Sequence, residues 1–249
     1  MQISPQTISP EITAKLNVIL QAGKYVTEDD WNWRQIKREC EKLRDIHPSS
    51  GWSMLSLAHG LTGNIAVAQH AFEAAIALEK NPLYITNWLA TLGNLGLYLK
   101  IHELFAVYGN PISGEFSDRF EIGLHAGAFH KLTEFIGSAE KMRLDMTTLD
   151  TSLPKNIAAL LRKAGVTDHD VARQLEAAGT VLNRHKLFYT GAPEISVCDI
   201  PDAFIGVTFA FTLPVDGKDI FSYNIQLAKE EMAMNIQKNH AFDVVFVQR

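Results

Sequence analysis

Histidine side chains stand close together in one short segment, where they could support metal binding. The segment HAGAFH places His125 and His130 five residues apart. Metal-binding pairs on a helix usually stand three or four residues apart, so that both rings lie on one face. A turn between packed helices explains a spacing of five better, and we predict no metal site here.

A second segment, TDHD, combines two acids with a histidine and could support acid–base chemistry. Thr167 and Asp170 stand at the spacing of a helix capping box. Asp168 is favoured in a first helical turn because its charge opposes the positive end of the helix dipole. The segment therefore predicts the start of a helix, and we assign no catalytic residue to it.

Aromatic and sulfur side chains offer two further candidates. Trp31 and Trp33 alternate beside basic residues in DDWNWRQIKRECEK. This pattern favours one buried tryptophan and one edge contact over a ligand-stacking site. Cys40 and Cys198 are the only cysteines and form no CxxC pair, so neither a disulfide framework nor a zinc site is expected. We interpret Cys198, on a predicted strand, as a small core residue.

Residues 156–179 resemble the helix-turn-helix of DNA-binding regulators. Gly165, Val166 and Val171 stand where that motif needs them. Gln174 occupies a normally apolar position, and a reading helix that opens with acidic residues would repel phosphates. DNA regulation is therefore retained only as a lesser alternative.

Composition and motifs narrow the function classes further. The 249 residues are 47% hydrophobic and 20% charged, with a formal net charge of −5. These values indicate a globular protein without the overall basic field typical of nucleic-acid binders. No phosphate-loop, dinucleotide, G-x-S-x-G or H-E-x-x-H motif occurs, so we expect no cofactor.

The first residues do not resemble a signal peptide, and no apolar run nears the roughly 20 residues of a membrane span. A cytoplasmic location is expected.

A 33-residue spacing organises the N-terminal half. It relates Leu55 to Trp88, Gly63 to Gly96 and Phe72 to Phe105. Gly63 makes a turn between two predicted helices, and Asn64 is a good N-cap for the second. On that second helix Ala68, Phe72, Ala75 and Ile76 form one inward stripe. The small alanines predict that the two helices approach each other closely.

This unit resembles the tetratricopeptide repeat. Trp52, Leu55, Gly63, Ala68, Phe72 and Ala75 match the residue types of the pattern, whereas Ser56 replaces a usual glycine and Pro82 comes two residues late. The second unit has Ile101 in place of an alanine. The resemblance implies a stack of helical hairpins whose concave groove binds a protein or peptide. On this basis Leu57, Leu61, Ala90 and Asn94 are the expected partner-binding residues.

The C-terminal residues follow a different pattern. Two helices are predicted up to about residue 186, followed by two strands, a long helix and a final strand. In the second strand the bulky side chains of Val207, Phe209 and Phe211 alternate with small or polar ones. Helical spacing of Phe221, Ile225, Ala228, Met232 and Ile236 predicts the long helix.

Together these features predict an α+β protein with two domains. Residues 1–147 form a repeat-like helical stack, and residues 148–249 form a small α-α-β-β-α-β sandwich. The leading hypothesis is an interaction, scaffold or inhibitor protein, whose C-terminal domain adds a second binding surface or a homo-oligomer contact. An enzyme with a site in the crevice between stack and sheet is the alternative. No membrane partner is predicted.

Overall fold

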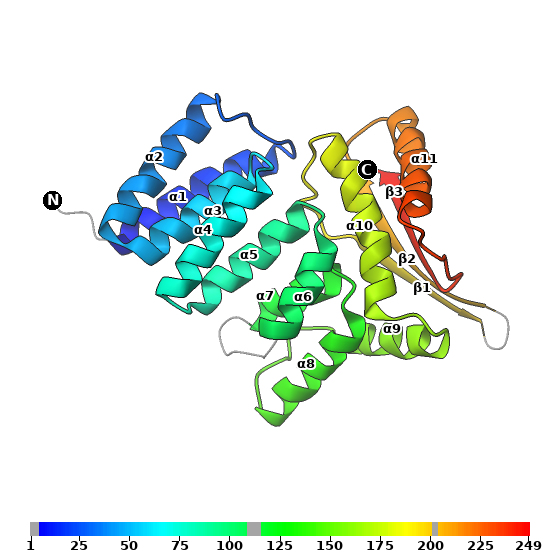
Figure 1. The fold of residues 1–249 in the computed structure, drawn as a ribbon. Coiled ribbons are helices and arrows are strands. Elements are labelled where there is room, and N and C mark those ends of the chain that lie inside the picture. Colours follow the sequence, from blue (N-terminus) through cyan, green and yellow to red (C-terminus); the bar gives the residue numbers. More distant parts are fainter. Residues whose placement is uncertain (1–4, 109–115, 201–203) are drawn as a thin grey trace. The chain divides into compact units, whose positions relative to one another are not determined.

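The computed structural model describes residues 5–108, 116–200 and 204–249, with side chains from residue 10 onward. The described part holds eleven helices and a three-stranded sheet, which is an α+β fold. Figure 1 shows the helices and strands along the chain. The chain divides into two compact units: residues 1–95 with 185–190, and residues 96–184 with 191–249.

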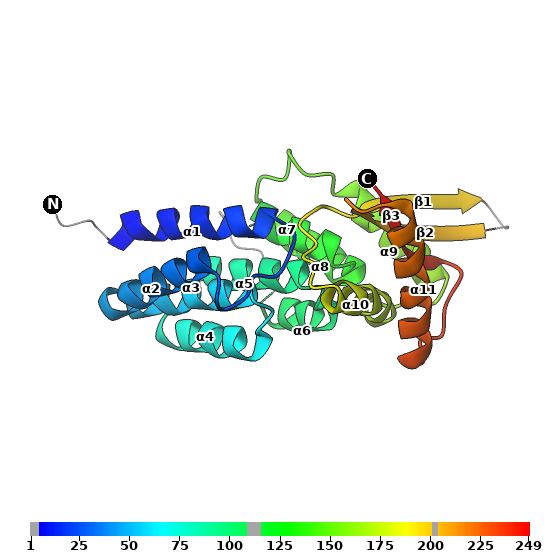
Figure 2. The same ribbon diagram turned by 90° about the horizontal axis from the view of Figure 1, so that it is seen from above.

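The first unit consists of five helices. They are α1 (Pro5–Gln21), α2 (Trp31–Ile46), α3 (Pro48–Gly60), α4 (Ile65–Leu78) and α5 (Pro82–Asn94). Polar side chains fix several helix starts: Asp30, Asn64 and Asn81 each accept a hydrogen bond from a backbone N–H in the first turn of α2, α4 and α5. In Figure 2, α1 and α4 lie on opposite sides of α3 and α5.

Helices α3 and α4 pack closely through small side chains. Gly63 in the turn between them has a φ of +71°, which favours glycine. Ala68, Ala71 and Ala75 are buried on α4 together with Phe72, so the predicted stripe is confirmed except at half-buried Ile76. The Phe72 ring stacks on Trp88 of α5, with ring centroids 5.3 Å apart.

The second unit contains the remaining elements. Its helices are α6 (Tyr98–Tyr108), α7 (Phe116–His125), α8 (Phe129–Lys141), α9 (Ser152–Lys163), α10 (Asp168–Arg184) and α11 (Gly217–Ala233). A phenylalanine-rich core joins α6, α7 and α8. Phe105 contributes to this core and packs on α7, where a Cβ added to Gly123 would lie 3.0 Å from its ring. Phe72 and Phe105 thus each pack against the helix that follows their own.

The sheet has the strand order β1-β2-β3, with β1 (Glu194–Ile200), β2 (Phe204–Leu213) and β3 (Phe242–Gln248). β1 is antiparallel to β2, and β2 is parallel to β3. The bulky side chains of β2 and β3 are buried on one face, where Phe209 lies near Phe242 and Phe211 near Phe246. The predicted order α-α-β-β-α-β is confirmed.

The predicted long helix is confirmed as α11, but the apolar residues at helical spacing that indicated it do not form its buried face. Phe221 and Met232 are 70% and 77% exposed, whereas Tyr223, Leu227 and Glu231 are the buried residues of this helix. The reason is that α11 lies along the edge of β3. Asn224 donates from Nδ2 to the Phe246 carbonyl and accepts from the Phe246 N–H, both at 2.9 Å. This contact turns the Tyr223 face inward.

The predicted domain boundary differs from the division between the two compact units. The boundary predicted between residues 147 and 148 falls inside the second unit, and as a domain boundary it stays a prediction.

Among the helices of the described ranges, we find none whose length and apolar character would let it span a membrane.

Candidate functional site

One cavity in the first unit brings together all four residues expected to bind a partner. Leu57 lines this cavity from α3, and Leu61 lines it from the position directly after α3. Ala90 and Asn94 line it from α5. The cavity has a volume of about 210 Å³. We call it the α3–α5 groove. Leu61 is buried at its wall, whereas Ala90 is exposed.

The two helices that form the groove are held in close contact. A Cβ added to Gly60 would lie 2.7 Å from the Thr91 methyl group. A larger residue at position 60 would therefore require the Thr91 side chain or α5 itself to shift. The glycine at position 60 thus favours the close approach of α3 and α5.

Sequence reasoning missed two other walls of the groove. Thr13, Leu16, Asn17 and Leu20 of α1 line one side of it. Phe188 lines it from a segment nearly one hundred residues beyond α5. Periodicity within α1 marks an apolar face but does not say which helix that face contacts, so no local signal could have placed α1 there.

Phe188 is held in the first unit by backbone hydrogen bonds. Its N–H donates to the Gly23 carbonyl at 2.9 Å, and the Tyr189 N–H donates to the Asn94 carbonyl at 3.0 Å. The Phe188 ring also lies against Tyr25, with centroids 4.6 Å apart. The short segment from 185 to 190 therefore joins the turn after α1 to the end of α5.

The lining of the groove is neutral. Its polar side chains are hydroxyl and amide groups, and the rest are apolar. These polar residues are Thr13, Asn17, Asn87, Thr91 and Asn94. Such a surface can bury an apolar side chain and exchange hydrogen bonds with a peptide backbone, and it favours neither acidic nor basic ligands.

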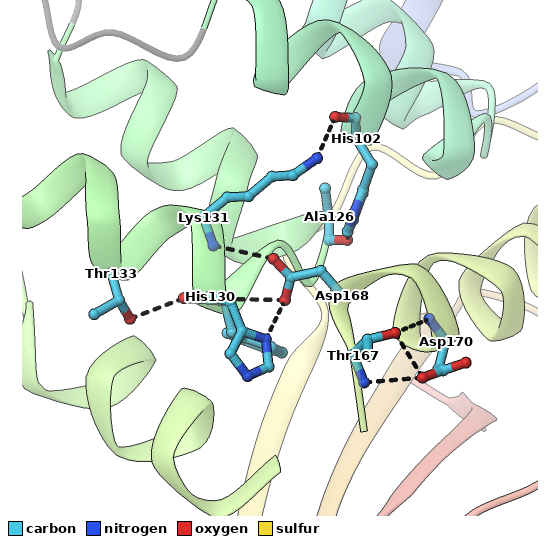
Figure 3. A network of polar contacts seen from close by, with 9 residues as sticks. His102, Ala126, His130, Lys131, Thr133, Thr167, Asp168 and Asp170 are labelled. Atoms are coloured by element: carbon cyan, nitrogen blue, oxygen red, sulfur yellow. Dashed lines mark hydrogen bonds and ion pairs between the residues drawn. The ribbon is translucent and has the colours of Figure 1, made fainter. Parts of the chain in front are cut away.

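The second unit contains a polar network around Asp168, shown in Figure 3. One carboxylate oxygen of Asp168 accepts from the His130 backbone N–H at 3.0 Å and lies 2.8 Å from His130 Nδ1. The other accepts from the Lys131 N–H at 3.0 Å. Lys131 Nζ in turn donates to the His102 carbonyl, and His102 Nε2 lies 2.7 Å from the Ala126 carbonyl.

This network has a structural explanation. Ala128 stands at the N-cap of α8 and offers no side-chain acceptor. Asp168, at the start of α10, therefore supplies the oxygens that the first N–H groups of α8 need. Thr167 and Asp170 make the predicted capping box of α10, with bonds of 2.6 to 3.2 Å. Both acids of TDHD thus have capping roles.

Burial disfavours the charged form of two histidines in and near this network, His102 and His125. Burial lowers the pKa of His102 and of His125 below the ordinary value of 6.5. His125 ends α7 and His130 lies in the first turn of α8, in agreement with the predicted turn between helices. Within the described ranges, no three histidine, cysteine or acidic side chains are placed to hold a metal ion.

The tryptophan and cysteine residues considered as candidates in the sequence differ in their burial. Trp33 is buried and donates from Nε1 to the Ala58 carbonyl at 2.7 Å, while Trp31 is exposed, as predicted. Cys40 is buried. Cys198 is exposed, so its interpretation as a core residue is wrong. The reason is that Cys198 pairs with Gly206, so its side chain lies on the sheet face opposite the buried face of Val207 and Phe209.

The burial of α10 disfavours the DNA-binding alternative. Most of its residues are buried, among them Val171, Gln174, Leu175 and Val181. A reading helix must offer an exposed face to the major groove of DNA. Arg184 is also engaged, in an ion pair with Glu230 at 2.5 Å.

The chain matches no protein-family model, and it is not detectably similar to any curated protein or solved structure.

Proposed function

We propose that this protein binds a segment of a protein or peptide partner in the α3–α5 groove. The observation that carries the proposal is the convergence of Leu57, Leu61, Ala90 and Asn94 on one cavity. The resemblance of residues 50–82 to a tetratricopeptide repeat supports it, because such repeats bind partners on the first helices of successive units. Here those helices are α3 and α5.

The size and chemistry of the groove suggest which part of a partner it holds. Small-molecule sites usually have volumes of roughly 300 to 1,000 Å³, and this cavity is smaller, at about 210 Å³. It fits one large apolar side chain of a partner segment. The amides of Asn87 and Asn94 lie beside it and would hydrogen-bond the partner backbone. We therefore propose a neutral segment with an apolar anchor residue.

The proposal includes a compartment. Cys40 and Cys198 are both free thiols, and a reducing environment preserves exposed thiols such as that of Cys198. We accordingly place the protein in the cytoplasm as part of the same proposal.

Selection from a random peptide library displayed on phage tests the proposed site. The test compares the wild-type chain with Ala90→Arg, which puts a charged side chain at the groove. Ala77→Arg is the matched control, because Ala77 is exposed on α4, away from the groove lining. We expect enriched peptides to share an apolar anchor and to lose at least about tenfold in affinity, or roughly 1.4 kcal/mol, only with Ala90→Arg.

Two results would count against the proposal. One is the absence of any peptide that distinguishes the two variants. The other is a small molecule or metal that co-purifies with the chain at one per protein, since that result favours the enzyme alternative.

A further inference from the structure

The strand β1 has one edge that no described strand covers. Across the described ranges β1 pairs with β2 alone, through all seven of its residues. Six of those residues are exposed, including Val197 at 40% and Ile200 at 51%. The opposite edge of the sheet is different, because Asn224 of α11 bonds both backbone groups of Phe246 there.

The direction of the backbone groups on β1 follows from the pairing of β2. The Val207 N–H donates to the Ala241 carbonyl, so the backbone groups of Val207 point toward β3. Neighbouring residues in a strand point their N–H and C=O groups to opposite edges. Gly206 and Thr208 therefore bond β1, through their partners Cys198 and Ser196.

The alternate residues of β1 consequently direct their backbone groups outward. These residues are Ile195, Val197 and Asp199. Their three N–H and three C=O groups form a ready template for another strand. Natural edge strands are often protected by a proline, by charged side chains, lysine above all, or by a bulge. The sequence EISVCDI contains no proline and no lysine, its two acidic residues lie toward its ends, and its pairing with β2 runs without a bulge.

We propose that β1 pairs antiparallel with β1 of a second copy of this chain, with the twofold axis at Val197. The two three-stranded sheets then join into one sheet of six strands. In this register Val197 faces Val197 of the partner subunit, and Ile195 faces Asp199 of the partner subunit. Each of these pairs exchanges two N–H···O bonds, which satisfies all the outward backbone groups of both strands.

The self-complementarity of the strand is the argument for a second copy. Any other symmetric register leaves at least one of the three outward residues beyond the end of the partner strand. Centring the axis on Asp199 would also place two carboxylates opposite each other, which is unfavourable. With the axis at Val197, Glu194 faces Ile200 of the partner subunit, and no acidic side chain faces another. The proposal is independent of the groove, which lies in the other unit.

Disulfide trapping in the full-length protein tests this register. Directly opposite residues have Cβ atoms about 4.5 to 5.5 Å apart, whereas diagonal residues are about 7 to 8 Å apart. In a Cys198→Ser background, Val197→Cys should give a covalent dimer under mild oxidation. Ser196→Cys in the same background should give none, because residue 196 faces residue 198 of the partner subunit. Ser196→Cys with Cys198 retained should cross-link. Cys40 is buried and does not interfere.

Blocking the edge gives a second test. Val197→Pro removes an outward N–H that β2 does not use, and edge strands tolerate such a proline. Val197→Thr is the control that keeps the N–H. Analytical ultracentrifugation should show self-association for the wild type and the threonine variant, and monomers for the proline variant. Circular dichroism verifies that the variants are folded.

The results that overturn the proposal are distinct. They are a wild-type chain that stays monomeric up to its solubility limit, equal cross-linking at positions 196 and 197 in the Cys198→Ser background, or unchanged self-association with Val197→Pro.

Discussion

Gly179 of α10 lies directly against Gly96, so that a Cβ added to Gly179 would come within 2.0 Å of the Gly96 carbonyl oxygen. Gly96 also has a φ of +67°, in the region that favours glycine. Both glycines belong to the second unit. The contact is between backbones and has no flexible side chain that could move aside. It therefore determines how near α10 comes to the start of α6.

The first prediction concerns this contact. Gly179→Ala should lower the free energy of unfolding by about 3 kcal/mol or more, because the added methyl group must displace the backbone. Gly137→Ala on α8 is the control, since nothing lies within 4 Å of its added Cβ. That change should stabilise the protein by about 0.5 to 1 kcal/mol through helix propensity. Urea unfolding measures the unfolding free energy of both variants. Equal changes in the two variants would contradict the close contact between Gly179 and Gly96.

The cap that Asp168 provides for α8 should be worth a measurable amount. Asp168→Ala removes the acceptors of the His130 and Lys131 N–H groups. We expect a loss of about 1 to 2 kcal/mol in unfolding free energy, the upper range for a lost N-cap. Asp168→Asn keeps one acceptor oxygen and should therefore lower the unfolding free energy by less than Asp168→Ala. Hydrogen exchange of the α8 amides would report the loss locally, and unchanged exchange in the alanine variant would rule out the capping role.

Buried histidines should make the fold less stable in mild acid. Burial lowers the pKa of His59, His102 and His125 below 6.5. Below pH 6.5 the unfolded chain takes up protons that the folded chain excludes, so stability falls with pH until the lowered folded pKa values are reached. His102→Gln should reduce this slope while keeping a donor for the Ala126 carbonyl. An identical slope in chemical denaturation between pH 6.5 and 5 would exclude a contribution from His102.

The two faces of α11 should respond differently to truncation. Leu227→Ala removes a buried side chain and should destabilise the protein by about 2 to 5 kcal/mol. Phe221→Ala and Met232→Ala change exposed side chains and should stay within about 0.5 kcal/mol. Thermal and urea unfolding would distinguish them. A large loss at Phe221 would contradict the exposed position of its side chain.

Local spacing was sufficient to predict the helix pair around Gly63, the close approach through Ala68 and Ala75, and the order of elements after residue 148. These features depend on residues within a few turns or one strand of each other, where helical and strand periodicity leave few choices. The four residues named as partner-binding from the sequence stand in pairs one period apart and line one cavity, while their binding role stays a prediction. Their convergence on one cavity follows from the packing of α3 and α5.

The tertiary structure alone decided the features that join distant segments. Apolar spacing on α11 offered two possible faces, and the contact of Asn224 with β3 selected the Tyr223 face. Nothing near Ala128 in the sequence indicates that Asp168 would cap α8, and nothing near α1 indicates that Phe188 would share its groove. A sequence period records which side chains share a face. It does not record which partner meets that face, since partners come together only when the whole core packs.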